Sequence, residues 1–245
     1  MFSFFKSKPS LKELIPTNYI DIHSHLLPAI DDGSQNCQQS VLLVKQMAAF
    51  GFEQFVTTPH VFFGIWDNTK NIINDVKTQT IIDLIDNKID NKFGAAAEYM
   101  MNMEFVQLFQ SEQLLTLKDN YVLVEMSYIN PPIQLYEIIF DLQIAGYIPV
   151  LAHPERYSFY DNNFSEYYKL KKAGCLFQLN LLSTVGYYSP SVAKTADLLL
   201  EKGMIDFVGS DIHHQNHIDN FSSKLKIKNL DALENAINAN QFFRF

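Results

Sequence analysis

Arginine is scarce in this chain. Of its 245 residues, 17 are lysine and only two are arginine, Arg156 and Arg244. Most positions that tolerate either cation therefore carry lysine. A remaining arginine is informative, because the guanidinium fork binds phosphate in a way that an ammonium group does not. Arg244 is the penultimate residue, whereas Arg156 ends the motif His-Pro-Glu-Arg.

Cysteine and long apolar runs are also lacking. Cys37 and Cys175 form no CxxC pair, which argues against a disulfide framework, and both are expected to be buried as small apolar residues. No apolar run approaches the ~20 residues that span a bilayer. The first six residues lack the basic front and the apolar stretch of about 7–15 residues that mark a signal peptide. These shortages predict a soluble, cytoplasmic protein rather than a membrane protein.

Net positive charge is absent as well. The formal net charge is -8, which argues against nucleic acid as a partner, because phosphate backbones bind basic surfaces. A small phosphorylated substrate remains compatible with this charge if bound metal ions supply positive charge locally. The 47% of hydrophobic residues excludes a disordered chain.

What the sequence does have is a regular alternation of short β-rich runs and helical patterns. The expected strands are 19–22, 55–58, 92–97, 121–125, 148–151, 176–180 and 207–209; the expected helices are 34–50, 69–86, 103–109, 131–145, 164–173, 190–202 and 230–240. Ser34 is the expected N-cap of the first helix. Seven successive β–α units predict an α/β fold with parallel strands covered by helices. Residues 1–18 are expected to be an extension, with a short helix at 11–14 packed on the outside of the fold or on a partner, and 19–245 a single domain.

Histidine or carboxylate residues lie at the ends of six of these seven strands. They are Asp21-Ile-His23-Ser-His25 with Asp31-Asp32-Gly33 shortly after, His60, Glu98, Glu125, His153, and Asp211-Ile-His213. A single such His is more often a hydrogen-bonded structural residue, and a single Glu more often a helix N-terminal charge. The set as a whole instead predicts a metal site with several ions, because active sites of closed α/β barrels form at the C-terminal ends of the strands. His-x-His on a strand also places both imidazoles on one side of the sheet.

The donor types restrict the metal. All are nitrogen or oxygen donors, which suits Mn, Fe, Zn or Co better than Cu(I) or an iron–sulfur cluster. Nine donors exceed the needs of one tetrahedral zinc, so two or three divalent ions are predicted. Three such ions carry six positive charges, and the four carboxylates carry four negative ones. The remaining two positive charges, together with Arg156, suit a phosphate dianion.

The motifs together resemble a known family. Asp-Ile-His-Ser-His-Leu-Leu-Pro-Ala-Ile-Asp-Asp-Gly, Thr-Thr-Pro-His, Ala-His-Pro-Glu-Arg and Gly-Ser-Asp-Ile-His, in this order between about residues 19 and 217, are similar to the PHP (polymerase and histidinol phosphatase) superfamily. Within it they most resemble the bacterial protein-tyrosine phosphatases of capsule and exopolysaccharide operons, the CpsB/YwqE type. His-x-His alone is weak, because amidohydrolases share it, whereas the four motifs together are specific.

The resemblance implies a distorted (β/α)7 barrel, similar to a TIM barrel, with a trinuclear centre that commonly holds Mn²⁺. By position, His23, His25, Glu98 and Asp211 would hold one ion; Glu98, Glu125 and His153 a second; and Asp32, His60 and His213 a third. Asp31 would have a supporting role, and Arg156 would bind phosphate. The implied partner is a phosphotyrosyl protein, a bacterial tyrosine kinase that controls polysaccharide synthesis.

The substrate pocket departs from the family pattern. The family often has a second arginine a few residues after Ser-Asp-x-His, where this chain reads His214-Gln-Asn-His217-Ile. Either His217 replaces that arginine or the role is absent. The only tryptophan, Trp66, follows the Thr-Thr-Pro-His motif; it is either a rim for the phosphotyrosyl ring or part of an ordinary packed loop, and the same two readings hold for Tyr187-Tyr188.

The expected reaction is hydrolysis of phosphotyrosine by hydroxide that a metal ion has activated, with Arg156 and the metals holding the phosphoryl oxygens. The thiol route is excluded, because Leu43 and Leu181 stand where an arginine would follow each cysteine. Three alternatives remain: a small-molecule phosphatase such as histidinol-phosphate phosphatase, an amidohydrolase, and a metal-bound regulatory protein without turnover. An amidohydrolase would usually have a strand-end lysine where this chain has Glu98.

Overall fold

The computed structural model describes residues 8–161 and 163–245. The expectation of no signal peptide rests mainly on residues 1–6, which lie outside this range. The strands are β1 (Tyr19–Asp21), β2 (Phe52–Thr57), β3 (His60–Val61), β4 (Lys92–Ala95), β5 (Glu98–Met100), β6 (Tyr121–Glu125), β7 (Ile148–Ala152), β8 (Leu176–Asn180) and β9 (Phe207–Gly209). The α-helices are α1 (Cys37–Ala49), α2 (Lys70–Asp86), α3 (Met103–Ser111), α4 (Leu135–Ile144), α5 (Ser165–Lys172), α6 (Pro190–Glu201), α7 (Gln215–Asn220) and α8 (Leu230–Ala239).

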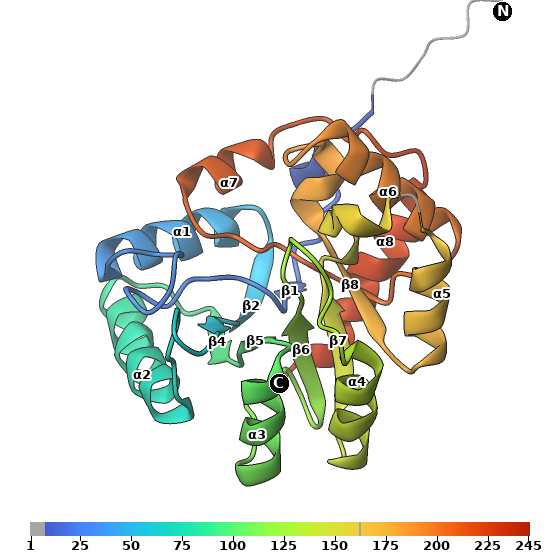
Figure 1. Ribbon diagram of the computed structural model, residues 1–245. Coiled ribbons are helices and arrows are strands. Elements are labelled where there is room, and N and C mark those ends of the chain that lie inside the picture. Colours follow the sequence, from blue (N-terminus) through green and yellow to red (C-terminus); the bar gives the residue numbers. More distant parts are fainter. Residues whose placement is uncertain (1–7, 162) are drawn as a thin grey trace, which may run out of the picture.

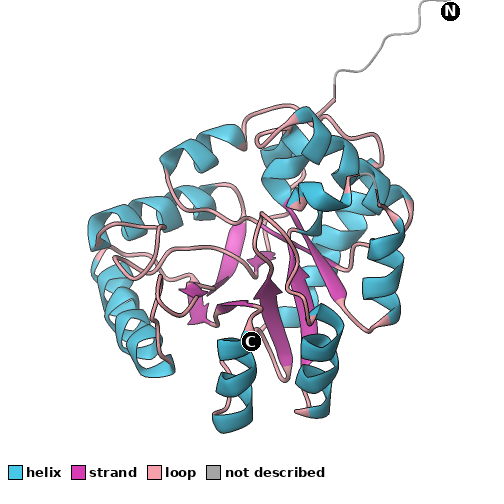
Figure 2. Ribbon diagram, viewed as in Figure 1, coloured by secondary structure: helices cyan, strands magenta, loops and turns pink. Residues whose placement is uncertain are grey.

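The strands form parallel sheets inside a layer of helices (Figures 1 and 2). One sheet has the order β1-β2-β4 and the other β3-β5-β6-β7-β8-β9. The chain segments after β1 and β9 also lie side by side, because the Asp211 N–H donates to the His23 carbonyl at 2.7 Å and the His25 N–H to the Ile212 carbonyl at 2.9 Å. The expected α/β class with parallel strands is confirmed.

Alternation along each strand separates a large core from a small one. On β6, Val122 and Val124 belong to the large core, whereas Leu123 belongs to a small core on the opposite face of the strands. Phe243, near the C-terminus, completes this small core. Because side chains alternate with period two, Glu125 points to the same side as Leu123. The small apolar core therefore lies on the same face of β6 as Glu125, a residue of the site described next.

Several expected boundaries are wrong. Asn36 rather than Ser34 caps α1, since the Asn36 side chain accepts a hydrogen bond from the Gln39 N–H at 3.0 Å. Helix α4 begins at Leu135 and not at Pro131; the Leu135 N–H bonds to the Pro132 carbonyl at 3.1 Å, and the segment before it is non-helical.

The strand expected at 92–97 is two strands. β4 ends at Ala95 and pairs with β2, whereas Glu98 opens β5, which pairs with β3 and β6. His60 likewise begins the short strand β3 rather than following a strand. Cys175 is buried as expected, but Cys37 is only partly buried.

The expected short helix near the N-terminus is a 3₁₀ helix, Leu11–Glu13, that packs on this same chain. Leu11 is fully buried, and the Leu11 and Lys12 N–H groups donate to the carbonyls of Ser223 and Phe221. Among the described residues, no helix combines the length and apolar character that crossing a membrane requires.

Candidate metal centre

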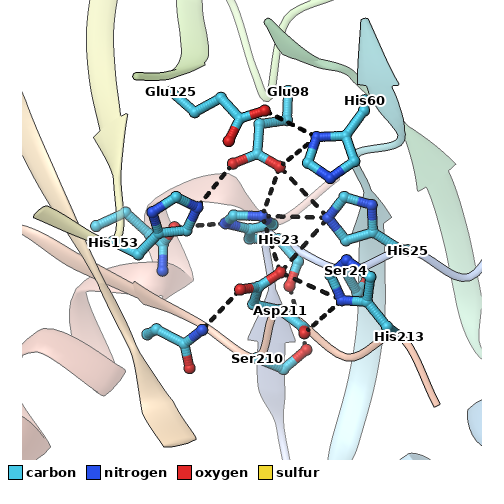
Figure 3. Close-up of polar contacts among 12 residues, drawn as sticks. His23, Ser24, His25, His60, Glu98, Glu125, His153, Ser210, Asp211 and His213 are labelled. Carbon is cyan, nitrogen blue, oxygen red and sulfur yellow. Dashed lines mark hydrogen bonds and ion pairs between the residues drawn. The ribbon is translucent and has the colours of Figure 1, made fainter. Parts of the chain in front are cut away.

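The structure brings all nine predicted donors together at one end of the strands. Figure 3 labels them all except Asp32. They fall into four overlapping groups whose ligand atoms lie within 4.8 Å of one another: His25, Asp32, His60 and His213; His23, Glu98 and His153; His23, His25 and Asp211; and His60, Glu98 and Glu125. Glu98 lies between the groups, with Oε2 at 3.2 Å from both His23 Nε2 and His60 Nδ1 and Oε1 at 3.0 Å from His153 Nε2. Residues about 190 positions apart in sequence therefore share one site.

The grouping differs from the division that the resemblance implies. His153 lies with His23 and Glu98, whereas Glu125 lies with His60 and Glu98, the Glu125 Oε1 to His60 Nδ1 distance being 2.9 Å. His60 also lies in the group that contains Asp32 and His213. His60 is thus placed between two of the groups.

Unusual backbone conformations present two of the donors. His153, directly after β7, and Asp211, two residues after β9, have positive φ angles of 36° and 50°. Non-glycine residues rarely adopt this left-handed region, and when they do they concentrate at functional sites. At both places the turn redirects the backbone after the strand, so that the His153 side chain points at Glu98 and the Asp211 side chain points at His23.

Two glycines allow the backbone to approach the His-x-His segment closely. A Cβ atom on Gly209 would lie 2.6 Å from the Cβ of His23, and one on Gly33 would lie 2.3 Å from the carbonyl oxygen of His25. Neither distance is sterically possible. The glycines of Gly-Ser-Asp and of Asp-Asp-Gly are therefore required for packing against His23 and His25.

The two histidines after β1 are held in the orientation that a metal ligand needs. His23 Nδ1 lies 2.6 Å from Gln178 Oε1, and His25 Nδ1 lies 2.8 Å from Asp31 Oδ2. Because both partners are acceptors, each Nδ1 donates its proton to them, and Nε2, which faces the carboxylates of Glu98 and Asp211, is the nitrogen that would bind a metal ion in place of a proton. The site thus fits divalent ions by its donor chemistry, and Asp31 contacts a donor in the supporting position expected for it.

Electrostatics keeps the central carboxylates ionised. Burial alone would raise the pKa of Glu98, but His23 and His60 hold that pKa well below its usual range. Burial also opposes ionisation of Asp211, and its histidine neighbours and Arg156 lower its pKa in turn. Both groups are therefore in the charged form that binds a metal cation.

Arg156 lies at the edge of this cluster between two tyrosine rings. Its Nη1 donates to Asp211 Oδ2 at 2.7 Å. The guanidinium carbon lies 4.0 Å from the centre of the Tyr188 ring and 4.7 Å from that of Tyr128, within the range of cation–π attraction. Its side chain is 19% exposed, so the guanidinium is held in place yet open to a ligand.

The two predicted substrate-binding residues lie in different surroundings. Trp66 lines a mainly apolar pocket with Phe63, Tyr99 and Leu108, and none of the nine donors lines it. His217 lies beside the donors: its Nδ1 accepts a hydrogen bond from the His213 N–H at 3.1 Å. Burial lowers the pKa of His217 to about 3, so at neutral pH it offers a hydrogen bond but not the charge of an arginine.

The sequence-based prediction missed two polar residues of β8. Gln178 orients His23, and Asn180 Nδ2 donates to Asp211 Oδ2 at 2.7 Å and to the Tyr188 hydroxyl at 2.8 Å. β8 is the one expected strand without a titratable residue at its end, so no site residue was predicted there. The signal was present, since residues 178 and 180 alternate with period two and must share a face.

The sequence matches a known protein family. Residues 19–224 match the family described as capsular polysaccharide synthesis, CpsB/CapC. The chain belongs to the CpsB/CapC family. Within it, the chain is 32% identical over 196 residues to the tyrosine-protein phosphatase YwqE of Bacillus subtilis, covering 80% of this chain and 77% of the relative. It is 25% identical over 199 residues to the putative tyrosine-protein phosphatase CapC of Staphylococcus aureus, covering 79% and 76% of the two chains.

A solved structure of this CpsB/CapC group has the same fold. It comes from the crystal structures of YwqE from Bacillus subtilis and CpsB from Streptococcus pneumoniae, described as unique metal-dependent tyrosine phosphatases; the TM-score is 0.78 at 30% identity, over 88% of this chain and 86% of the other. An amidohydrolase of Mycoplasma synoviae also resembles the chain, with a TM-score of 0.52 at 12% identity over 98% and 91% of the chains. That second likeness concerns the fold alone.

Proposed function

We propose that this CpsB/CapC chain is a metal-dependent protein-tyrosine phosphatase. The observation that carries the proposal is the convergence of nine nitrogen and oxygen donors beside a partly exposed arginine. The names of the relatives, tyrosine-protein phosphatases, support the same reaction. We also infer that the strands close into a distorted (β/α)7 barrel, which the backbone hydrogen bonds between the segments after β1 and β9 support.

The donors would hold two or three divalent ions, with Mn²⁺ proposed as the native metal and Fe, Zn or Co as alternatives. The residues are His23, His25, Asp32, His60, Glu98, Glu125, His153, Asp211 and His213. Bound ions would supply a water molecule activated at neutral pH and neutralise phosphoryl charge. No protein nucleophile is required for that chemistry.

The chain's own residues would orient the phosphate. Arg156 offers a planar donor fork at the edge of the cluster, and two N–H groups of one guanidinium can bind two phosphoryl oxygens at once. The nearby rings of Tyr128 and Tyr188 restrict its rotation. The same charge would stabilise negative charge that accumulates on the phosphoryl oxygens during hydrolysis.

The proposed substrate is phosphotyrosine in a protein, and the proposed partner is a bacterial tyrosine kinase of polysaccharide biosynthesis. A phenolic side chain is longer than that of serine and reaches donors that are mostly buried more easily. Phenolate is also a better leaving group than an alkoxide, so hydrolysis needs no strong general acid. The family description, capsular polysaccharide synthesis, supports the biological setting.

The test compares kcat/KM for a phosphotyrosyl peptide, a phosphoseryl peptide and histidinol phosphate under one metal condition. The phosphotyrosyl peptide is expected to have the highest value. If histidinol phosphate is preferred by more than about tenfold, a transition-state difference of ~1.4 kcal/mol, the chain is a small-molecule phosphatase instead. Metal content without hydrolysis of any phosphate ester would identify a regulatory protein.

A further inference from the structure

Six lysines gather on one surface of this acidic protein. The segment Lys224-Leu-Lys226-Ile-Lys228 alternates strictly: its three lysines are exposed, whereas Leu225 and Ile227 are buried at 2% and 1% exposure. In an alternating segment every second side chain lies on the same face, so the three lysine ammonium groups form a row. The row is joined by Lys8, Lys12 and Lys194, which are also exposed.

Contacts between the segments show that these six lysines form one surface. Lys8 Nζ donates to the carbonyls of Lys226 and Ile227 at 3.0 and 2.6 Å, and Lys12 Nζ donates to Ser222 Oγ at 3.3 Å. Lys194 lines one hollow together with Lys226 and Lys228. Figure 1 shows the chain between α7 and α8 passing beside α6, which carries Lys194. We call these six residues the lysine surface.

The charge of the lysine surface is only partly balanced within the described part of the chain, because Glu13 attracts Lys12 and Lys224 and Asp197 attracts Lys228 without forming an ion pair with them. None of its lysines has a carboxylate within 4.0 Å, whereas Lys169, Lys171 and Lys202 elsewhere each form an ion pair. The carboxylate in the hollow, Asp197, is already occupied, since its Oδ1 accepts hydrogen bonds from the N–H groups of Lys228 and Asn229 and from Asn229 Nδ2. A group of positive charges without ion-pair partners attracts a ligand with several negative charges.

The lysine surface contacts the chain segment that leads to Tyr188, the neighbour of Arg156. The Lys226 N–H donates to the Thr184 carbonyl at 2.8 Å, and the Lys226 Cγ lies 3.4 Å from where a Cβ of Gly186 would be. Tyr188, two residues further, lies against Arg156. Two residues span at most ~7 Å, so a peptide bound at Arg156 needs only a few residues to reach Lys226.

We propose that the lysine surface binds acidic residues that flank the phosphotyrosine in a polypeptide substrate. This inference rests on the proposed function and adds the chemistry of the substrate around the phosphorylated residue. Aspartate or glutamate side chains within a few residues of the phosphotyrosine would lie over Tyr187 and Tyr188 and reach Lys224, Lys226 and Lys228. The surface thus selects acidic sequence contexts over neutral ones and leaves the hydrolysis step itself unchanged.

The experiment compares two phosphotyrosyl peptides that differ only in the flanks, acidic (Asp and Glu) or neutral (Asn and Gln). The wild-type protein is expected to have a kcat/KM on the order of tenfold higher for the acidic peptide at low salt, from several exposed ion pairs of modest strength. The difference should fall as ionic strength rises. The triple variant Lys224→Gln, Lys226→Gln, Lys228→Gln should lose the difference and hydrolyse p-nitrophenyl phosphate at the wild-type rate.

A matched control removes three exposed lysines elsewhere, with Lys45→Gln, Lys172→Gln and Lys202→Gln. Lys172 and Lys202 lie at the C-terminal ends of α5 and α6, which lead into the next strands and thus lie at the opposite end of the sheet from the donors. This control should keep the preference. If it loses the preference as the first triple variant does, net charge and not the lysine surface is responsible, and the proposal is wrong.

Two other outcomes would also overturn it. One is an unchanged preference in the Lys224, Lys226 and Lys228 variant. The other is that this variant loses binding to vesicles of anionic phospholipid while keeping its peptide preference, which would assign the surface to a membrane. If the wild-type protein hydrolyses neither peptide, the proposed function fails on its own. Binding of the fluorescein-labelled acidic and neutral peptides, measured by anisotropy, then decides the inference separately.

Discussion

The nine donors divide into a buried part and an open part. Six of them expose 4% of the side chain or less: His23, His25, Glu98, Glu125, His153 and Asp211. The other three, Asp32, His60 and His213, expose 56%, 15% and 14%. We call these the inner and the outer donors.

The two parts are fixed by different forces. His23 and His25 of the inner donors have hydrogen-bonded partners in Gln178 and Asp31 and are packed against Gly209 and Gly33. Asp32, in contrast, is more than half exposed and is 3.5 Å from both His60 Nε2 and His213 Nε2. Folding therefore sets the inner geometry in advance, whereas the outer donors retain contact with solvent.

The largest expected effect comes from removing an inner donor. His23→Ala removes a donor shared by two of the groups and should lower the phosphatase rate on the order of a thousandfold, more than the 10–100-fold typical of groups that only support a ligand. Metal content should fall with it. Asp32→Ala should lose less metal and less activity, because Asp32 belongs to only one of the four groups and is more than half exposed. Equal losses in metal analysis and assays of both variants would contradict the division.

A smaller effect is expected at Arg156, which contacts an inner donor but is not itself a donor. Arg156→Lys keeps the charge and loses the two-pronged grip on phosphate, so the rate should fall about tenfold to a thousandfold. Metal content should be unchanged, which separates this variant from His23→Ala. A wild-type rate would remove Arg156 from the reaction.

The smallest effect is expected from the support of the inner donors. Asp31→Asn replaces the carboxylate that fixes His25, and the affinity for Mn²⁺ should drop about tenfold to a hundredfold, measured by titration of the metal-free protein. Asp75→Asn, at an exposed carboxylate on α2, is the matched control and should bind the metal as the wild type does. An unchanged affinity in Asp31→Asn would show that His25 is oriented by packing alone.

Most inner and outer donors could be predicted from the sequence because they lie at the ends of parallel strands, whatever their later burial. Asp32 lies in the loop after β1 and was predicted from the family resemblance. What the sequence did not reveal was how the strands divide. The chain from Lys92 to Met100 was expected to be one strand up to residue 97, but it pairs first with β2 and then with β3 and β6. Such a shift depends on pairing with distant segments and leaves no mark in local propensity.

The supporting residues were harder to find for a related reason. Gln178 and Asn180 carry no charge, and their importance appears only when β8 lies beside the ends of β1 and β9. The left-handed conformations of His153 and Asp211 are likewise set by the tertiary structure, since neither residue type requires them. Asp31, in contrast, could be placed because it adjoins Asp32 in a recognisable motif.

The most direct test of the account follows metal content and hydrolysis of p-nitrophenyl phosphate together while ions are removed by a chelator and then restored with Mn²⁺. The account predicts that activity disappears with the ions and returns with them, and that the ion held by the outer donors leaves first because solvent reaches it most readily. Full activity in a preparation shown by elemental analysis to hold no metal would contradict the central claim.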